Sequence, residues 1–398
     1  MHQLVMQMRI LVIDNVNYTD YPTGGIMNFY RNMLPAFGND LVLAGIMTET
    51  GMPVGKWGHR KIFDIDYEYY TMANVVPSSK KPLVPERITN SFRIRRHIRR
   101  IVKRNDFDVI LTQSPEVVYS IPNRLLEKTC YVLPGVGNPL VISRYPWARP
   151  LAKMYDRFFM MPKAAKAKWL LAAADERSRE LFALRSNGRI NADRVLEFPT
   201  RYDEKYYQVK NRLQCRKQLC LHESDNIFIT VGRLGWFKGW KLMIDALKVA
   251  SSTIDNAKLL FIGDGEDEEK IKDYIKEQHM QDSVLLLGKK TPQEIGLYLN
   301  AADVFVMGSF AEGWSTTLLE ACACGVPCVV TDFSSAKSMV TNGVNGYVVE
   351  EREEQLFCKF MLDALQMNRE EVATYNKKFE YLSLGNLKKE LITILEQR

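Results

Sequence analysis

Short apolar runs alternate with amphipathic stretches along the whole chain, and this alternation predicts an α/β fold with buried parallel strands. In the first half, the runs that indicate strands are 8–13, 40–44, 109–112, 130–133 and 195–199. In the second half they are 227–231, 259–262, 284–287, 304–307 and 328–330. These runs lack a polar face, as expected of strands covered by helices on both sides of a sheet.

Helical periodicity fills most intervals between these runs. The predicted helices are 26–37, 91–104, 117–127, the whole of 150–185, those opened by Thr291, Ser315 and Ser334, and two or three at the C-terminal end. The segment 48–85, rich in glycine, proline and aromatic residues, gives no assignable element. Its Asp64-Ile65-Asp66 lies in a strand-like alternation, so we interpret this D-x-D as incidental and not as the metal motif of another fold.

Strand–helix alternation on both sides of a hinge at 200–203 predicts two doubly wound, Rossmann-like domains. The chain of 398 residues is long enough for both. The expected divisions are a first domain of residues 1–203, a second of residues 204–370, and C-terminal helices at 371–398.

Composition narrows the class of protein. Apolar residues make up 46% and charged residues 25% of the chain, which is ordinary for a globular protein. No apolar run approaches the ~18 residues that span a bilayer, and residues 8–13 are too short and lack the cleavage site of a signal peptide. We expect a cytoplasmic protein. The seven cysteines show no paired framework, and we interpret Cys322, Cys324 and Cys328 as small core residues instead of a metal site.

Charge is unevenly spread between the halves. Residues 1–200 hold 29 Lys and Arg against 18 Asp and Glu, whereas residues 201–398 hold 25 against 29. The basic half is therefore expected to meet an anionic partner. The helix at 91–104 combines an apolar stripe, in which we include Phe92, with cations on its other faces. It is either a solvated surface helix or a peripheral contact with anionic membrane lipids through Arg95, Arg96, Arg99, Arg100 and Lys103. Nucleic acid is disfavoured, because no recognisable nucleic-acid motif accompanies these cations.

The stretch 304–331 contains the chain's strongest chemical pattern. A strand leads through Gly308 and Gly313 into a helix opened by Ser315, whose free backbone N–H groups suit a phosphate. Glu312 and Glu320 flank that helix start. A carboxylate repels a phosphate, so the pair fits better as acceptors for sugar hydroxyls on either side of a diphosphate. Taken singly, each Glu could also be a dipole cap or a solvated helix residue.

A second pattern follows the strand 227–231, where Gly232-Arg233 leads to Lys238-Gly239. Arg supplies a planar fork and Lys a mobile point charge for diphosphate oxygens. The alternative is an ordinary surface turn with two cations. Glycines also follow other strands, at Gly24-Gly25, at Gly263 and Gly265, and at Gly288-Lys289.

The E-x7-E spacing of Glu312 and Glu320 within EGWSTTLLEACACGVPCVVTD resembles the signature of the retaining GT-B-fold glycosyltransferases of family 4 (glycosyltransferase group 1), and most closely its bacterial surface-polysaccharide members. The likeness covers most of the C-terminal half and extends weakly to the first strand and its glycine pair. It implies a cleft between two Rossmann-like domains, with a last helix crossing back to the first domain.

The resemblance implies roles for these residues. Arg233 and Lys238 would stabilise the departing diphosphate, Glu312 would hold the sugar, and Glu320 would accept the ribose hydroxyls. These diphosphate cations leave little need for a metal. The remaining donor-binding residues would be Gly24, Gly25, Gly232, Gly263, Gly265, Gly288, Lys289, Gly313, Trp314, Ser315, Thr316 and Thr317.

In the first half, the strand ends place Gln113 and Asn138 at a candidate acceptor or sugar site. Here the chain departs from the family, many members of which carry a histidine after the strand 130–133. None of the five histidines of this chain falls there. We interpret Asn138 as a hydrogen-bonding substitute.

The sequence therefore predicts transfer of a hexosyl group from a nucleotide sugar, with UDP favoured, to a glycan or lipid-linked acceptor in surface-polysaccharide synthesis. Two alternatives remain at this point. One is a nucleotide-sugar epimerase on the same fold, and the other is a non-catalytic scaffold at a membrane surface.

Overall fold

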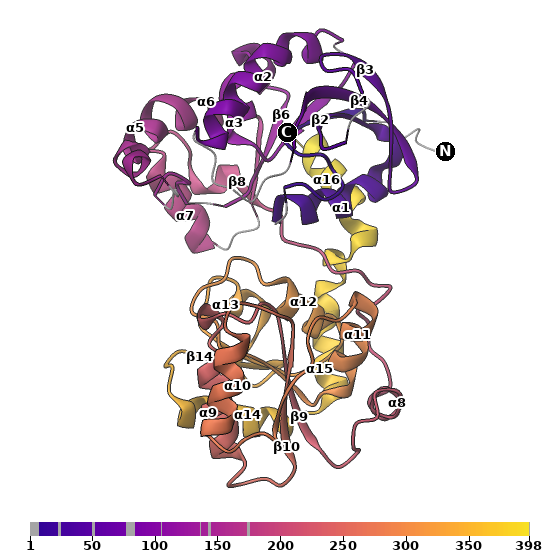
Figure 1. Ribbon diagram of the computed structural model, residues 1–398, viewed down its shortest axis with the longest axis vertical. Coiled ribbons are helices and arrows are strands. Elements are labelled where there is room, and N and C mark those ends of the chain that lie inside the picture. Colours follow the sequence, from indigo (N-terminus) through magenta and orange to yellow (C-terminus); the bar gives the residue numbers. More distant parts are fainter. Residues whose placement is uncertain are drawn as a thin grey trace. The chain divides into compact units, whose positions relative to one another are not determined.

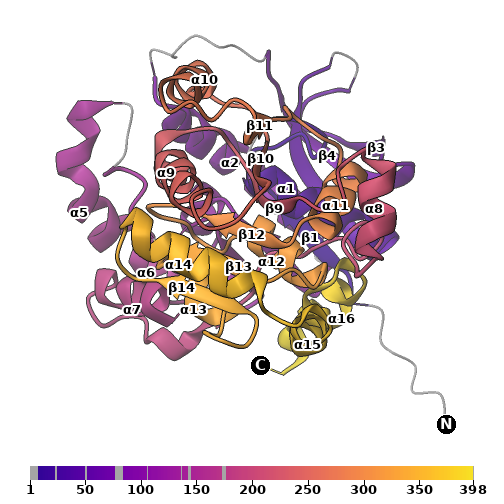
Figure 2. The same cartoon turned by 90° about the horizontal axis from the view of Figure 1, so that it is seen from below.

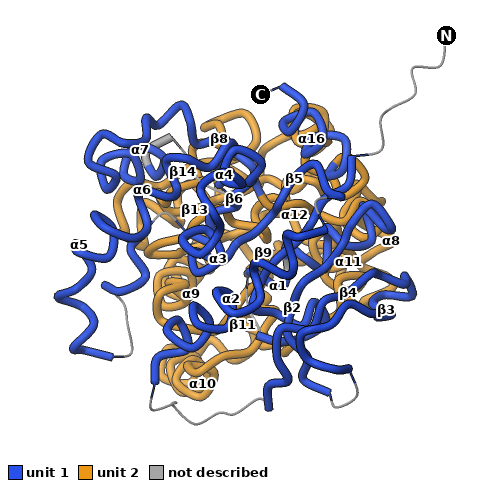
Figure 3. The backbone as a smooth tube through the Cα atoms, turned by 90° about the horizontal axis from the view of Figure 1, so that it is seen from above, with its two compact units in different colours: residues 1–199, 387–398 blue, residues 200–386 orange. Residues whose placement is uncertain are grey.

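The computed structural model describes residues 8–22, 25–49, 52–76, 84–104, 106–135, 137–141, 145–172 and 176–397. The chain divides into two compact units, which Figure 3 shows in different colours. Unit 1 comprises residues 1–199 and 387–398, and unit 2 comprises residues 200–386. The division expected from the sequence lies at residue 203, and its second boundary, at 370, stays a prediction.

Unit 1 contains a sheet with strand order β3-β4-β2-β1-β5-β6-β7-β8. Figure 1 labels β2, β3, β4, β6 and β8 of this sheet. Its strands are β1 (Ile10–Ile13), β2 (Leu41–Met47), β3 (Trp57–Ile62), β4 (Ile65–Asn74), β5 (Val109–Thr112), β6 (Thr129–Leu133), β7 (Trp169–Ala172) and β8 (Val195–Glu197). All neighbours pair in parallel except β3 with β4. In the central register, Leu11 lies between Val42 and Ile110.

The helices of unit 1 are α1 (Gly25–Phe37), α2 (Glu86–Val102), α3 (Pro115–Ser120), α4 (Asn123–Leu126), α5 (Ala152–Tyr155), α6 (Met161–Ala164) and α7 (Glu176–Arg185). A 3-10 turn at Pro146–Leu151 precedes α5, and a π-helical segment at Asp156–Met160 follows it. The last helix, α16 (Leu384–Glu396), begins in unit 2 and buries Leu387, Leu391 and Leu395 in unit 1. Lys388 on α16 pairs with Asp40 at 2.6 Å.

Unit 2 contains an all-parallel sheet with strand order β11-β10-β9-β12-β13-β14. Its strands are β9 (Asn226–Val231), β10 (Ala257–Ile262), β11 (Val284–Leu286), β12 (Val304–Met307), β13 (Cys328–Thr331) and β14 (Gly346–Val349). Its helices are α8 (Arg212–Gln218), α9 (Trp240–Ala250), α10 (Glu268–Glu277), α11 (Pro292–Ala301), α12 (Thr316–Ala323), α13 (Ala336–Met339), α14 (Glu354–Leu365) and α15 (Arg369–Asn376).

Alternate residues of the unit 2 strands enter different cores, because successive side chains of a strand point to opposite faces of the sheet. Phe228 packs with α9 and α14, which lie side by side in Figure 2. Its neighbours Ile227 and Ile229 pack with α12 on the other face. The sheet is therefore covered by helices on both faces, as the apolar runs predict. Cys322, Cys324 and Cys328 are fully buried in the core on the α12 face of the sheet.

The prediction of one continuous helical region at 150–185 is wrong. Trp169–Ala172 forms strand β7, buried between β6 and β8. A short apolar run has no periodicity that separates a strand from a buried helix, and helices on both sides favoured the wrong assignment. The prediction of one helix at 117–127 is also wrong, since Pro122 separates α3 from α4.

Phe92 does not lie on the buried stripe of α2. Its side chain is 68% exposed, whereas Ile94, His97, Ile98 and Ile101 are buried. Two residues correspond to about 200° of helix rotation, so Phe92 projects opposite Ile94. The hairpin β3–β4 and the edge strand β14 are elements that the sequence pattern did not reveal. Among the helices that the structure describes, none is long and apolar enough to cross a membrane.

Candidate active site

The loops that follow the unit 2 strands pack backbone against backbone. A Cβ atom on Gly263 would stand 1.9 Å from the carbonyl oxygen of Gly232, and one on Gly265 would stand 2.2 Å from that of Leu234. A Cβ on Gly239, whose φ is +68°, would stand 1.8 Å from the carbonyl oxygen of Gly308. These positions therefore require glycine for close approach. The absent side chains leave main-chain groups lining the carboxyl edge of the sheet.

A pocket of about 530 Å³ opens at this edge, and predicted donor residues line it: Gly232, Arg233, Gly263, Gly265 and Lys289. Arg233 donates to Glu266 at 2.8 Å, and Lys289 pairs with Asp264 at 2.8 Å. Both cationic side chains are well exposed, at 66% and 76%. Exposed ion pairs contribute little free energy. An anionic ligand can therefore replace the carboxylate of Glu266 beside Arg233, or that of Asp264 beside Lys289, at small cost.

Lys238 and Glu312, two of the predicted catalytic residues, contact each other directly. Nζ of Lys238 lies 2.5 Å from Oε1 of Glu312, which also accepts a hydrogen bond from the hydroxyl of Ser309 at 2.6 Å. Both side chains are largely shielded from water, at 23% and 15% exposed. Arg233 and Lys238 line the same narrow recess together with Ser309. The structure thus brings the three predicted catalytic residues onto neighbouring loops.

The start of α12 is held by hydroxyl groups. Ser315 accepts from the N–H of Leu318 as the N-cap, and Ser335 accepts from the N–H of Ser315 at 3.1 Å and donates to the carbonyl of Gly313 at 2.9 Å. Thr316 donates to the hydroxyl of Thr200 at 3.2 Å. These bonds fix the helix terminus whose N–H groups point toward the loop, which is the geometry that anion binding needs.

Three further predicted residues lie around α12. The indole N–H of Trp314 is buried without a partner. Glu320 is half-buried, and desolvation raises its pKa to about 8, although a hydrogen bond with Tyr207 works in the opposite direction. Glu320 is thus mainly protonated near neutral pH. Thr317 lies beside Ser315, with 3.4 Å between their hydroxyl oxygens.

The predicted residues of unit 1 separate into several places. Gly24 lies outside the described residues, and Gly25 is the first residue of α1. Gln113 is buried and donates to the carbonyl of Ile26 at 3.1 Å. Unit 1 also contains a pocket of about 620 Å³ with polar groups in its wall, called the polar pocket below, and Gln113 does not line it. In unit 2, the carbonyl of Gly288 accepts from the N–H of Gly263 at 3.0 Å. The five predicted membrane-contact cations of the 91–104 segment are all exposed.

Asn138 does line that polar pocket, but most of its amide is already used. Its Nδ2 donates to the carbonyl of Ala152 at 2.8 Å and to Asp156 at 2.7 Å, while its Oδ1 accepts from the N–H of Leu140 at 2.8 Å. Asp156 in turn pairs with Arg185 at 2.6 Å. One lone pair of the amide oxygen remains for a ligand.

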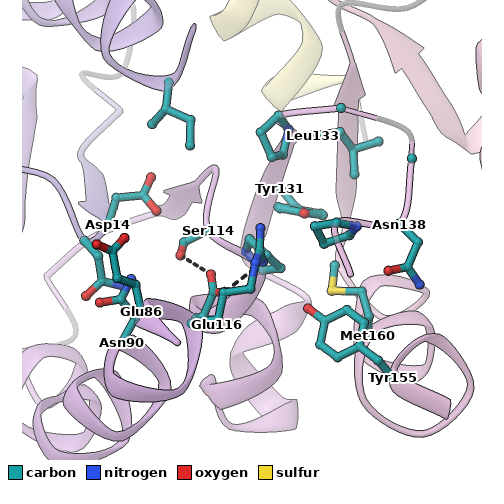
Figure 4. Close-up of a pocket in the computed structure, with 18 of the residues that line it drawn as sticks. Asp14, Glu86, Asn90, Ser114, Glu116, Tyr131, Leu133, Asn138, Tyr155 and Met160 are labelled. Atoms are coloured by element: carbon teal, nitrogen blue, oxygen red, sulfur yellow. Dashed lines mark hydrogen bonds and ion pairs between the residues drawn. The ribbon is translucent and has the colours of Figure 1, made fainter. Parts of the chain in front are cut away.

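The polar pocket of unit 1 has a volume of about 620 Å³ and opens at the carboxyl ends of β1, β5 and β6. Figure 4 shows Asp14, Glu86 and Asn90 on one side of it and Asn138 and Tyr155 on the other. Glu116 lies between them and accepts hydrogen bonds from Ser114 at 2.8 Å and Arg87 at 2.9 Å (Figure 4).

Asp14 is buried at the edge of this pocket. Its carboxylate accepts hydrogen bonds from Tyr30, from Thr112 at 3.1 Å and from the N–H of Gln113 at 2.9 Å. Burial raises the pKa of Asp14 to about 7, against the effect of these three donors. The pocket therefore presents carboxyl groups, amides and aromatic rings together.

Sequence reasoning missed several residues of both sites. Arg352 donates to the carbonyls of Gly308 and Ser309 and stacks 3.6 Å from the Phe310 ring centroid, so it holds the loop that carries Glu312. It follows β14, and without that strand nothing in the sequence marks it. Asp14 gave a usable signal, because it follows the first strand at the edge where ligands bind.

Comparisons with known proteins agree with this architecture. Residues 211–380 match the family model described as glycosyl transferases group 1. The chain is 32% identical over 148 residues to N-acetyl-alpha-D-glucosaminyl L-malate synthase of Bacillus anthracis, covering 37% of this chain and 38% of that protein. It is 24% identical over 258 residues to the UDP-Gal:alpha-D-GlcNAc-diphosphoundecaprenol alpha-1,3-galactosyltransferase of Escherichia coli, covering 63% and 64%.

The solved structure of Anabaena HepE in complex with UDP and glucose superposes with a TM-score of 0.65 at 16% identity, over 98% of this chain and all of that one. The segment 211–380 thus matches the model of glycosyl transferases group 1, and the chain has the GT-B fold of two Rossmann-like domains. The family resemblance and the fold class predicted from the sequence are confirmed. The alignments span less than two thirds of the two curated relatives named above.

Gly265→Ala tests the backbone packing of the loops. The new Cβ would overlap the carbonyl of Leu234, so we expect unit 2 to lose about 1–3 kcal/mol of unfolding free energy. Gly313→Ala is the matched control, because a Cβ there meets nothing within 4 Å; its effect should stay below about 0.5 kcal/mol. Urea unfolding of both variants measures the difference, and equal stabilities would refute the packing argument.

Glu320→Gln tests the raised pKa of Glu320. The folded protein keeps a proton that the unfolded chain releases between the ordinary pKa of 4.5 and about 8, so the native state loses stability as pH rises through this window. The glutamine variant lacks this loss. Its melting temperature should exceed that of the native protein by about 3 °C or more at about pH 9 and by less at about pH 5. Parallel melting curves across pH would show that Glu320 has an ordinary pKa.

Proposed function

We propose that this protein is a glycosyltransferase that moves a hexosyl group from a nucleotide-diphosphate sugar, with UDP favoured, to a glycan or lipid-linked acceptor with retention of configuration. The observation that carries the proposal is the convergence of Arg233, Lys238 and Glu312 on adjoining glycine-lined loops, within the segment that matches the family model. The galactosyltransferase named above acts on a lipid-linked sugar, and HepE binds UDP and glucose. Both support a nucleotide-sugar donor, and the galactosyltransferase also supports a lipid-linked acceptor. We propose that this acceptor is used in cell-surface polysaccharide synthesis.

In the proposed reaction, the bond between C1 of the sugar and the diphosphate oxygen breaks as C1 bonds to the acceptor hydroxyl oxygen. The hydroxyl proton passes to the departing diphosphate. Negative charge develops on the diphosphate as its bond to C1 breaks, before the proton arrives. Arg233 and Lys238 would stabilise this charge together with the N–H groups at the start of α12. These groups supply the positive charge that the step requires, so we expect it to proceed without a metal.

The ion pair between Lys238 and Glu312 suggests how donor binding prepares the site. A diphosphate carries more charge than one carboxylate and would draw Lys238 away from Glu312. Glu312 would then have lone pairs available for sugar hydroxyls while Ser309 continues to orient it. Glu320, largely protonated in the free protein, would accept ribose hydroxyls with little repulsion from the phosphates.

A thermal-shift panel with UDP, GDP, ADP and their common hexose conjugates tests the donor class. A ligand at ~100 times its dissociation constant adds about 2.7 kcal/mol to the unfolding free energy, which gives a measurable shift. We expect one nucleotide series to bind and Arg233→Ala to reduce its shift. Lys248→Ala, which removes an exposed cation of α9, is the matched control.

Glu312→Gln separates binding from transfer. The variant should keep its nucleotide-dependent shift but lose transfer by about 100-fold or more, because the amide cannot accept sugar hydroxyls as a carboxylate does. Normal transfer in both Glu312→Gln and Arg233→Ala would overturn the assignment. Release of an epimerised free sugar would identify an epimerase, and membrane binding without any nucleotide shift would identify a scaffold.

We also propose that the exposed cations of α2 and the residue after it meet an anionic inner membrane surface, with the protein peripheral on the cytoplasmic side. Each cation near such a surface contributes about 1 kcal/mol. Replacing Arg95, Arg96 and Arg99 with Gln should weaken sedimentation with phosphatidylserine vesicles by about 100-fold. Phosphatidylcholine vesicles and the variant Lys248→Gln with Lys276→Gln are the controls. Unchanged sedimentation would make α2 an ordinary solvated helix.

A further inference from the structure

The polar pocket of unit 1 adjoins an apolar groove of about 580 Å³. The two share walls formed by Glu86, Arg87, Pro139 and Tyr155, so one ligand can enter both. Aromatic and aliphatic side chains line the groove, among them Phe92, Trp147, Leu151 and Phe159. These four are between 39% and 68% exposed, which is unusual for large apolar side chains gathered in one place.

The polar pocket carries polar groups without partners. Nδ2 of Asn15 is buried and makes no hydrogen bond, and its side chain lines the pocket with only 9% of the residue exposed. The hydroxyl of Tyr155 is also buried without a partner, and Figure 4 shows it directed into the pocket. A buried donor left unpaired costs free energy, so a ligand that pairs with both atoms gains affinity.

The charges favour a neutral head group in the polar pocket. Glu86 and the ionised fraction of Asp14 would repel a phosphate there. The two cations that line the pocket are already engaged, since Arg87 pairs with Glu116 at 2.9 Å and Arg185 with Asp156 at 2.6 Å. Carboxyl groups, amides and the Tyr131 and Tyr155 rings together match the hydroxyls and apolar faces of a sugar.

We propose that unit 1 binds an amphiphilic acceptor, with its sugar head in the polar pocket and its hydrocarbon chain in the adjoining apolar groove. This inference rests on the proposed function, because it names the acceptor class of the same enzyme. An anionic link between head and chain would meet the exposed Arg95 in the groove. The hydrocarbon chain of the acceptor fills the groove with CH₂ groups, and these replace water along the four exposed side chains of the groove.

Titration of the full-length protein with hexyl, octyl and decyl glucosides and galactosides, each below its micelle concentration, tests this arrangement. Calorimetry should show the dissociation constant falling by about two- to fourfold per methylene, the upper value corresponding to complete burial. Phe92→Ser with Leu151→Ser should flatten this dependence. Leu184→Ser, which removes an exposed leucine outside both pockets, should leave it unchanged.

The sugar head is tested separately. Asn15→Ala should weaken every glycoside by about fivefold and leave the chain-length dependence intact, because one hydrogen bond is lost. Octyl phosphocholine, which has the chain without the sugar, should bind more weakly than the best octyl glycoside. The inference is overturned if no glycoside binds, if affinity ignores chain length, or if the phosphocholine binds equally well.

The nucleotide thermal shift of the same variants keeps the two proposals distinguishable. A normal nucleotide shift without glycoside binding refutes the acceptor site and leaves the glycosyltransferase assignment standing. Glycoside binding without any nucleotide shift refutes the glycosyltransferase assignment and leaves an amphiphile-binding site in unit 1 standing.

Discussion

The close approach of main-chain atoms between the βα loops of unit 2 is the constraint on which the candidate active site depends. The N–H of Leu234 donates to the carbonyl of Asp264 at 2.9 Å, and the N–H of Phe310 donates to that of Phe237 at 2.8 Å. Glycines at the crossing points allow these bonds, since any side chain there would separate the loops. Arg233, Lys238 and Glu312 thus project from loops that are bonded to one another. Their spacing is set by backbone geometry, which is what a site that stabilises developing charge requires.

The electrostatic arrangement answers a difficulty that the sequence raises. Two carboxylates beside a proposed diphosphate site should repel the ligand. In the structure, however, Glu312 is neutralised by Lys238, and burial raises the pKa of Glu320 to about 8. Neither group therefore presents a full free charge at the start of α12. Under the proposed function, the donor replaces one ion pair with another, and its net cost is smaller than that of bringing a dianion to two bare carboxylates.

The sequence predicts well where local signals agree. Strand β12, the cap at Ser315 and strand β13 lie where apolar runs, a capping hydroxyl and the Gly325 and Pro327 stop signals placed them. Prediction from the sequence fails where burial in the folded protein determines the type of element or the exposure of a side chain. Strand β7 has the same apolar letters as a buried helix segment, and the exposed position of Phe92 follows from a helix phase that its apolar character obscures. The contact between Lys238 and Glu312, 74 residues apart, is a product of the fold and carries no local signal.

Unit 1 illustrates the same limit at the position of the missing histidine. The sequence places Asn138 there as a hydrogen-bonding group, and the structure shows its amide joined to Asp156 and, through it, to Arg185. Arg185 also donates to the carbonyl of Gly137 at 2.9 Å, so this network holds the loop that borders the polar pocket. An imidazole could not supply two N–H donors and an acceptor at once. The chain therefore uses this position to shape the wall of its pocket, and recognition of a sugar there would fall to groups whose polar atoms are free, namely Asn15 and Tyr155.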